Sequence, residues 1–180
     1  MWALVHQQLY NAGEAMLTGD KELAYKVISR ERRVNAFELK IDSDCEDIIA
    51  LYAPVAIDLR FVLAMYKINT NLERLGDFAE SIARFAGNLP EGEPIDPQLV
   101  KETRVEEMLS ELLSMISLTK EAFEKESSEI ASRIFLKDNL IDEINHNSTA
   151  IIAKYIEEHK GSALAGLYMA GVIRKMERFG

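Results

Sequence analysis

Residues 72–77, Leu-Glu-Arg-Leu-Gly-Asp, lie within an apolar pattern of helical spacing, and residues 176–180, Met-Glu-Arg-Phe-Gly, repeat most of that stretch. On a helix, Glu73 and Asp77 are one turn apart, so their carboxylates share a face and repel each other. We therefore expect a cationic partner opposite them. Gly76, inside the helix, costs roughly 1 kcal/mol against alanine, which favours close approach of a neighbouring helix or a ligand.

Apolar residues recur at helical spacing along the whole chain, and no segment has the period-two alternation of a strand. The first half predicts a short helix over about residues 2–18, a long helix from about Lys21 to Leu51, and a third helix with Pro54 in its first turn. The second half predicts a helix starting at Asp96-Pro97, a long helix after Ser127-Ser128, and a last helix after residues 159–162.

The order of helix, long helix and motif helix thus occurs twice, in residues 1–86 and 98–180. Residues 87–97, with two glycines and three prolines, are predicted to be the linker. We predict an all-α protein made of two tandem three-helix bundles, because internal repetition indicates duplicated architecture. The helical pattern starts at Trp2 without a cap and stops inside the second motif, so we expect the native chain to extend beyond both ends.

Composition excludes several classes of function. The net charge is −9, and no cluster of basic residues stands out, which argues against a nucleic-acid partner. Cys45 is the single cysteine, so an internal disulfide is excluded and a reducing compartment is indicated. No apolar run is long enough to span a bilayer, and no signal peptide is visible, so we expect a cytoplasmic protein.

Acidic and amide side chains recur at helical spacing on three of the predicted helices. They are Glu31, Asn35 and Glu38 on the second helix, Glu73, Asp77 and Glu80 on the third, and Asp138, Asp142 and Asn145 on the fifth. Hard cations bind clustered carboxylate oxygens, and facing helices of a bundle can assemble such clusters. The alternative is that these acids pair with arginines such as Arg30, Arg33, Arg74 or Arg178, or lie on a solvated face.

Residues 54–60, Pro-Val-Ala-Ile-Asp-Leu-Arg, together with residues 71–77, Asn-Leu-Glu-Arg-Leu-Gly-Asp, closely resemble the PhoU family of regulators of phosphate-specific transport. That family consists of two tandem three-helix repeats, each with a Glu-Arg-x-Gly-Asp segment on its third helix. The second half of this chain departs from the pattern, because no Asp-Leu-Arg precedes Met176. The resemblance implies the same fold that the helical pattern predicts.

The resemblance also implies a metal site, because PhoU relatives hold metal clusters, iron among them. The expected ion is iron or another divalent or trivalent cation, such as zinc, magnesium or manganese. Carried over by position, the implied ligands are Glu31, Asn35, Glu38, Glu73 and Asp77 in the first repeat, and Asp138, Asp142, Asn145 and Glu177 in the second. No nucleophile–base constellation is present in the sequence, so we expect no catalytic residue and no enzymatic activity.

By resemblance, the chain restrains a phosphate ABC transporter and a phosphate-sensing histidine kinase through protein contact. The implied partners are the ATPase subunit of the transporter, the kinase, and further copies of the chain in a homodimer or larger oligomer. Attachment to the membrane is then only through those partners. The alternatives are a metal-storage or metal-oxidising bundle, which the absence of Glu-x-x-His pairs disfavours, and a purely structural helical module with neither metal nor partner.

Overall fold

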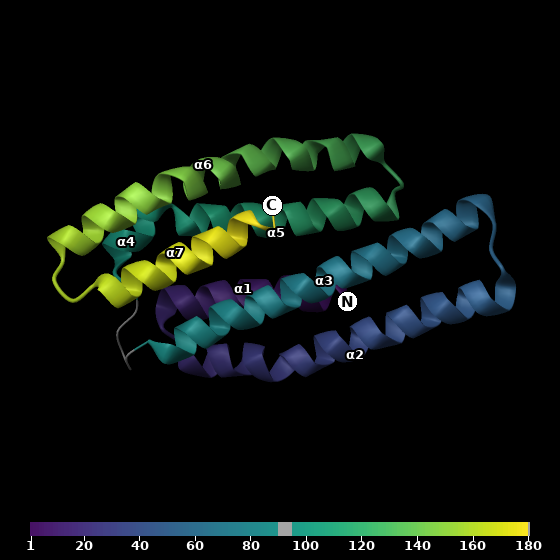
Figure 1. Cartoon of the computed structure of the whole chain (residues 1–180), viewed down its shortest axis with the longest axis horizontal. Coiled ribbons are helices and arrows are strands. Elements are labelled where there is room, and N and C mark those ends of the chain that lie inside the picture. The colour runs from purple at the N-terminus through teal and green to yellow at the C-terminus, as the bar shows by residue number, and fades with distance from the viewer. Residues whose placement is uncertain (90–94, 180) are drawn as a thin grey trace.

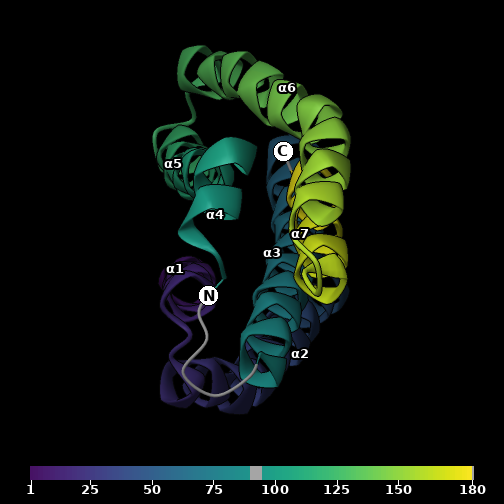
Figure 2. The ribbon, with the colours of Figure 1, turned by 90° about the vertical axis from the view of Figure 1, so that its left-hand side faces the viewer.

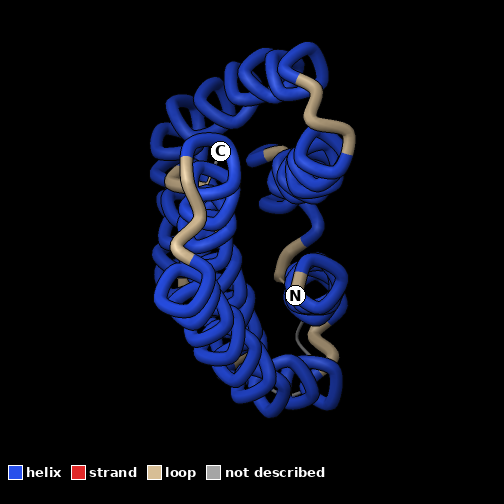
Figure 3. Tube along the Cα trace, turned by 90° about the vertical axis from the view of Figure 1, so that its right-hand side faces the viewer, coloured by secondary structure: helices blue, strands red, loops and turns tan. Residues whose placement is uncertain are grey.

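A computed structural model of the chain describes residues 1–89 and 95–179. In these residues there are seven helices and no strand (Figures 1 and 3). The helices are α1 (Trp2–Thr18), α2 (Lys21–Tyr52), α3 (Ala56–Asn88), α4 (Pro97–Thr103), α5 (Val105–Glu124), α6 (Ser128–Glu158) and α7 (Ala163–Glu177). The predicted all-α class is confirmed. The middle of the predicted linker, residues 90–94, lies outside the described residues.

Local capping chemistry marks several of the helix ends. Gly19 adopts a left-handed conformation (φ 71°) and ends α1, and the side chain of Asp20 accepts the Leu23 N–H at 2.9 Å to begin α2. The hydroxyl of Ser127 accepts the Ile130 N–H at 3.3 Å and begins α6. These ends agree with the predicted bounds of the first two helices and with the predicted start of the long helix after Ser127-Ser128.

Two predicted details are wrong. Pro54 precedes the N-cap residue of α3, Val55, so it lies in the turn and not in the first helical turn. The predicted fourth helix is two helices, because Arg104 adopts a left-handed conformation (φ 56°) that ends α4 and starts α5. A helix cannot continue through such a residue, and periodicity alone does not reveal the break because both pieces keep their apolar stripes.

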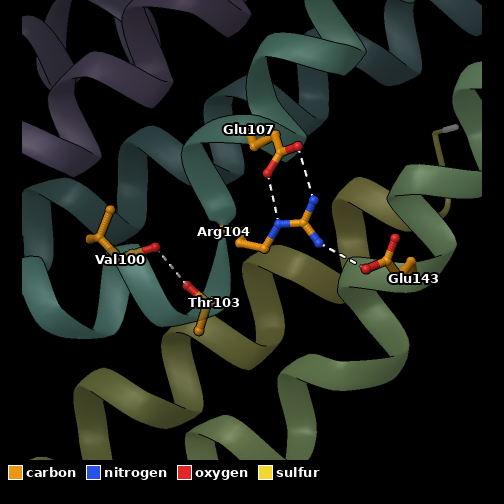
Figure 4. Close-up of polar contacts among 5 residues, drawn as sticks. All are labelled: Val100, Thr103, Arg104, Glu107 and Glu143. Atoms are coloured by element: carbon orange, nitrogen blue, oxygen red, sulfur yellow. Dashed lines mark hydrogen bonds and ion pairs between the residues drawn. The ribbon is translucent and has the colours of Figure 1, made fainter.

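Polar contacts stabilise the break between α4 and α5 (Figure 4). The Arg104 guanidinium donates to both carboxylate oxygens of Glu107, at 2.7 and 2.9 Å, and to Glu143 of α6 at 2.9 Å. The buried Thr103 hydroxyl donates to the Val100 carbonyl at 3.2 Å. The bond to Glu143 ties the kink to α6, and the other bonds are local to the break.

The two repeats share one main core. α2 packs along α3 and α6 along α5 and α7, while α1 lies against both α3 and α5. Seen along the long axis, α1 and α5 stack on one side and α3 and α7 on the other, with α2 and α6 at opposite ends of the stack (Figure 2). Apolar side chains from all seven helices form a single continuous cluster, so the repeats are joined by burial.

The turn between α2 and α3 projects beyond the other helices (Figure 1). Leu51, Tyr52, Val55 and Ile57 lie at this end, and each is more than 70% exposed. Exposed large apolar side chains gathered in one place are unusual on a soluble monomer. Among the described helices, none is both long and apolar enough to cross a membrane.

Candidate functional site

The candidate site lies beside Gly76, where α3 packs tightly against α2. A Cβ atom on Gly76 would lie 2.7 Å from Cγ1 of Val34, so only a residue without a side chain fits there. The close approach of a neighbouring helix at Gly76 is therefore confirmed, and the neighbour is α2. It brings the motif acids of α3 toward the predicted ligands of α2. We call this face the acidic seam, which consists of Glu31, Asn35, Glu38, Asn69, Glu73 and Asp77.

Burial and neighbouring negative charge raise the pKa of the Glu73 carboxyl to about 7. Burial contributes most, followed by the negative charges of Asp77 and Glu38, a hydrogen bond with Asp77, and the charge of Glu31. Glu31 and Glu38 belong to α2, and Asp77 belongs to α3. The negative charges of α2 therefore raise the pKa of a motif carboxylate on α3.

The two seam glutamates of α2, Glu31 and Glu38, also have raised pKa values. Burial raises the pKa of Glu31, and the charges of Glu80 and Asp77 raise it further. Burial also raises the pKa of Glu38, followed by the charges of Asp42 and Asp77. Asp77 acts on both, so the acids of α2 and α3 form one electrostatic group. Their repulsion disfavours the fully ionised seam.

Three buried oxygens of the seam have no hydrogen-bond partner: Glu31 Oε1, Asn35 Oδ1 and Asn69 Oδ1. The amide of Asn69 is fixed, because its Nδ2 donates to the Glu38 carbonyl at 2.9 Å and to Asp42 Oδ1 at 2.7 Å. Buried oxygens without a donor cost free energy, so such a group is a candidate for binding a cation.

The seam is not neutralised by arginine among the described residues. Their ion pairs include Arg84 with Glu80 at 2.6 Å, at the edge of the seam, but none with Glu31, Glu38, Glu73 or Asp77. This observation weighs against the alternative in which arginines pair with these acids. Burial and the mutual repulsion of these acids therefore both oppose full ionisation of the seam.

The donor chemistry of the seam fits a hard cation, which prefers carboxylate and amide oxygens. In the described parts of the chain, no three Asp, Glu, His or Cys side chains are close enough together to hold one ion as they stand. Coordination would therefore use the amide oxygens of Asn35 and Asn69 beside the carboxylates, with side-chain rotation. When bound, the cation would offset the negative charge and link α2 to α3.

Part of this site was not found from the sequence. No role was given to Asp42, and the hydrogen bonds that join Asn69 to α2 were not indicated. Asp42 follows Glu38 by one helical turn, so extending the periodic series Glu31–Asn35–Glu38 by four residues would have found it. The contact between Asn69 and Asp42 spans two helices, and helical spacing within either one carries no sign of it.

The structure places the predicted residues of the second repeat differently. On α6, Asp138 and Asn145 are half-buried and Asp142 is exposed, and Glu177 is the half-buried last residue of α7. No hydrogen bond or ion pair between described residues joins Glu177 to those of α6. Both sets stay predictions as metal ligands, although acids of the first set lie close enough to shift the pKa of Glu73.

Both halves of the chain match the profile of the PhoU domain, over residues 1–86 and 105–180. A PhoU homolog of the phosphate-specific transport system from Aquifex aeolicus is 33% identical over 99% of this chain and 79% of its own length. The accessory protein PhoU of that system from Escherichia coli is 33% identical over the full chain and 73% of its own length.

Solved structures with a similar fold are also of PhoU proteins. The crystal structure of PhoU from Pseudomonas aeruginosa superposes with a TM-score of 0.91 at 29% identity, over 99% of this chain and 84% of that one. The crystal structure of the phosphate transport system regulatory protein PhoU from Streptococcus pneumoniae superposes with a TM-score of 0.82 at 28% identity. The match covers 99% of this chain and 83% of that one. The fold and the seam thus define a class of all-α proteins with paired three-helix repeats. Within that class, this chain belongs to the PhoU family.

Proposed function

We propose that this chain is an accessory protein of a phosphate-specific transport system and regulates phosphate uptake by protein contact. Two lines of support are the match of both halves to the PhoU domain and the accessory role that the names of its relatives state. The proposed partners are the ATPase subunit of the transporter and a phosphate-sensing histidine kinase. The proposed setting is the cytoplasmic side of the membrane, and no catalytic step is assigned to the chain.

The observation that carries this proposal is the exposed apolar end of the α2–α3 hairpin, formed by Leu51, Tyr52, Val55 and Ile57. Exposed apolar patches on soluble proteins mark interaction surfaces, because burying them against a partner removes apolar area from water. The hairpin projects beyond the rest of the bundle, so a partner can reach it without rearrangement of the core (Figure 1). We assign this end to the ATPase subunit.

A cation in the acidic seam would act on the same hairpin. Glu31, Asn35, Glu38, Glu73 and Asp77 would hold it, together with Asn69, and the ion would supply positive charge that offsets their repulsion. The seam and the exposed end belong to the same two helices. Binding of the ion would therefore stiffen the α2–α3 pair and bias its docking.

The test is binding of the purified chain to the transporter ATPase subunit, measured by biolayer interferometry. Leu51→Glu with Ile57→Glu should weaken binding by at least about tenfold, because a charge is placed in a buried apolar contact. The matched control is Leu136→Glu, which changes an exposed leucine of α6 and should leave binding unchanged. Equal binding by the wild type and the hairpin variant would contradict the proposed surface.

A further inference from the structure

A cavity of about 270 Å³ that is open to solvent lies between α3 and α7, and it shares Asp77 with the acidic seam. It joins the two copies of the Glu-Arg-x-Gly motif, one from each repeat. Its wall consists of Arg74, Asp77, Phe78 and Ser81 from α3, Lys175 from α7, and Arg178 and Phe179 directly after α7.

The cationic side chains of both helices line this one cavity. Arg74, Phe78 and Ser81 are at i, i+4 and i+7 on α3, so they share a face, and Lys175 and Arg178 are three residues apart. The Lys175 ammonium donates a hydrogen bond to the Ser81 hydroxyl, which links the two faces.

Aromatic rings position Arg74. Its guanidinium carbon lies 5.9 Å from the centre of the Phe179 ring, a cation–π distance, and the Phe179 ring is 4.8 Å from that of the buried Phe78. An arginine held this way keeps its N–H groups free for a ligand. The guanidinium is therefore oriented by packing and not by a carboxylate.

The charge of this cavity is opposite to that of the whole chain, whose net charge is −9. Lys175 and the arginines at 74 and 178 supply three positive charges, and Asp77 supplies one negative charge. The ion pairs found between described residues do not involve any of the three cations. Like charges repel, so an anion among them would be bound favourably.

We propose that this cavity binds a tetrahedral oxyanion of the phosphoryl class, as free orthophosphate or as the phosphate of a small monoester. A guanidinium donates two parallel hydrogen bonds to such an anion, which suits Arg74 and Arg178. Lys175 and the Ser81 hydroxyl add a point charge and a further donor. The site depends on α3 and α7 together, so the bound anion would link the two repeats. The proposal stands independently of docking at the α2–α3 end.

Asp77 gives the site a distinctive property, because it belongs to the acidic seam and also lines the cavity. Its negative charge opposes an anion beside it. Removing that charge should therefore tighten anion binding. If the acidic surface acted on the anion only through its overall charge, removing any nearby carboxylate would raise the affinity for the anion equally.

The experiment is isothermal titration of the full chain, treated with chelator, with sodium orthophosphate at constant ionic strength. Arg74→Gln and Arg178→Gln should each weaken binding by at least about tenfold, because each removes a bidentate charge-assisted contact. Arg174→Gln is the matched control: it removes the same charge from an exposed arginine of α7 that does not line the cavity. Asp77→Asn should bind orthophosphate more tightly than the wild type.

Parallel titrations with glycerol 3-phosphate identify the source of the phosphoryl group. Tighter binding of the monoester indicates a phosphorylated metabolite, and equal or weaker binding indicates free phosphate. Circular dichroism spectra confirm that each variant is folded, and Arg74→Lys, which keeps the charge, tests the contact if Arg74→Gln unfolds. Absence of saturable binding by the wild type would overturn the proposal. So would equal losses from changes at Arg74, Arg178 and Arg174.

Discussion

The Cβ position of Gly76 lies 2.7 Å from Cγ1 of Val34, and Val34 is completely buried. The first motif thus serves two purposes at adjacent positions. Its glycine lets α3 approach α2, and its acids then face the acids of that helix. The close packing of α3 on α2 also causes the repulsion between their acids, because it brings Glu73 near Glu38.

Gly76→Ala should destabilise the fold. The added methyl overlaps Val34, which costs about 1–3 kcal/mol and exceeds the roughly 1 kcal/mol that alanine gains in helix propensity. Urea unfolding monitored by circular dichroism measures the difference. The matched control is Gly171→Ala in α7, where a Cβ meets nothing within 4 Å, and this change should stabilise. If the two changes shift stability in the same direction, the steric account is wrong.

Glu73 should make the metal-free protein less stable as pH rises. Its pKa is raised from 4.5 to about 7 in the folded state, so folding favours the protonated form. That contribution is complete below pH 4.5 and is lost as pH rises through about 7. Thermal melts of chelator-treated protein should show the decline in the wild type and a smaller one in Glu73→Gln. Glu157→Gln, at an exposed position on α6, should keep the wild-type profile.

Removing the motif acids should separate metal binding from folding. We expect Glu73→Ala with Asp77→Ala to abolish uptake of ferrous, zinc, magnesium or manganese ions at the acidic seam. The metal-free fold should survive or be slightly more stable, because the repulsion between the carboxylates is relieved. Calorimetric titration and melts with and without chelator measure both effects. Strong destabilisation of the metal-free variant would indicate that these acids have a structural cationic partner.

The predicted metal ligands of the second repeat can be tested separately by counting the metal ions bound per chain. If Asp138 and Asp142 bind metal, then Asp138→Ala with Asp142→Ala should reduce the number of bound ions and leave binding at the seam intact. The two residues are one turn apart on α6, as Glu73 and Asp77 are on α3. An unchanged number of ions bound by this variant would restrict the metal site to the first repeat.

The break at Arg104 should depend on both the side chain and the backbone. Arg104→Ala loses the bonds to Glu107 and Glu143 and keeps the left-handed backbone, whereas Arg104→Gly loses the same bonds but adopts that backbone freely. Urea unfolding should therefore rank Arg104→Ala as less stable than Arg104→Gly. The reverse order would mean that the left-handed conformation carries no cost here.

The amino-acid sequence by itself determined the all-helical class, the duplicated order and the helices, apart from the break at Arg104. These features depend on local forces: apolar spacing of 3.6 residues, caps such as Asp20 and Ser127, and the left-handed Gly19. It also determined that Glu73 and Asp77 share a face, because one helical turn separates them. Residues close in the chain can be placed by helical geometry without knowledge of the rest of the molecule.

Only the tertiary structure decided which groups meet across helices. The bond from Asn69 to Asp42 and the salt link from Arg104 to Glu143 join residues 27 and 39 positions apart. The cavity between α3 and α7 brings together Arg74 and Arg178 from different repeats. Such contacts depend on how apolar stripes pack in three dimensions. Packing fixes the rotation and axial offset of each helix, and helical periodicity does not specify either quantity.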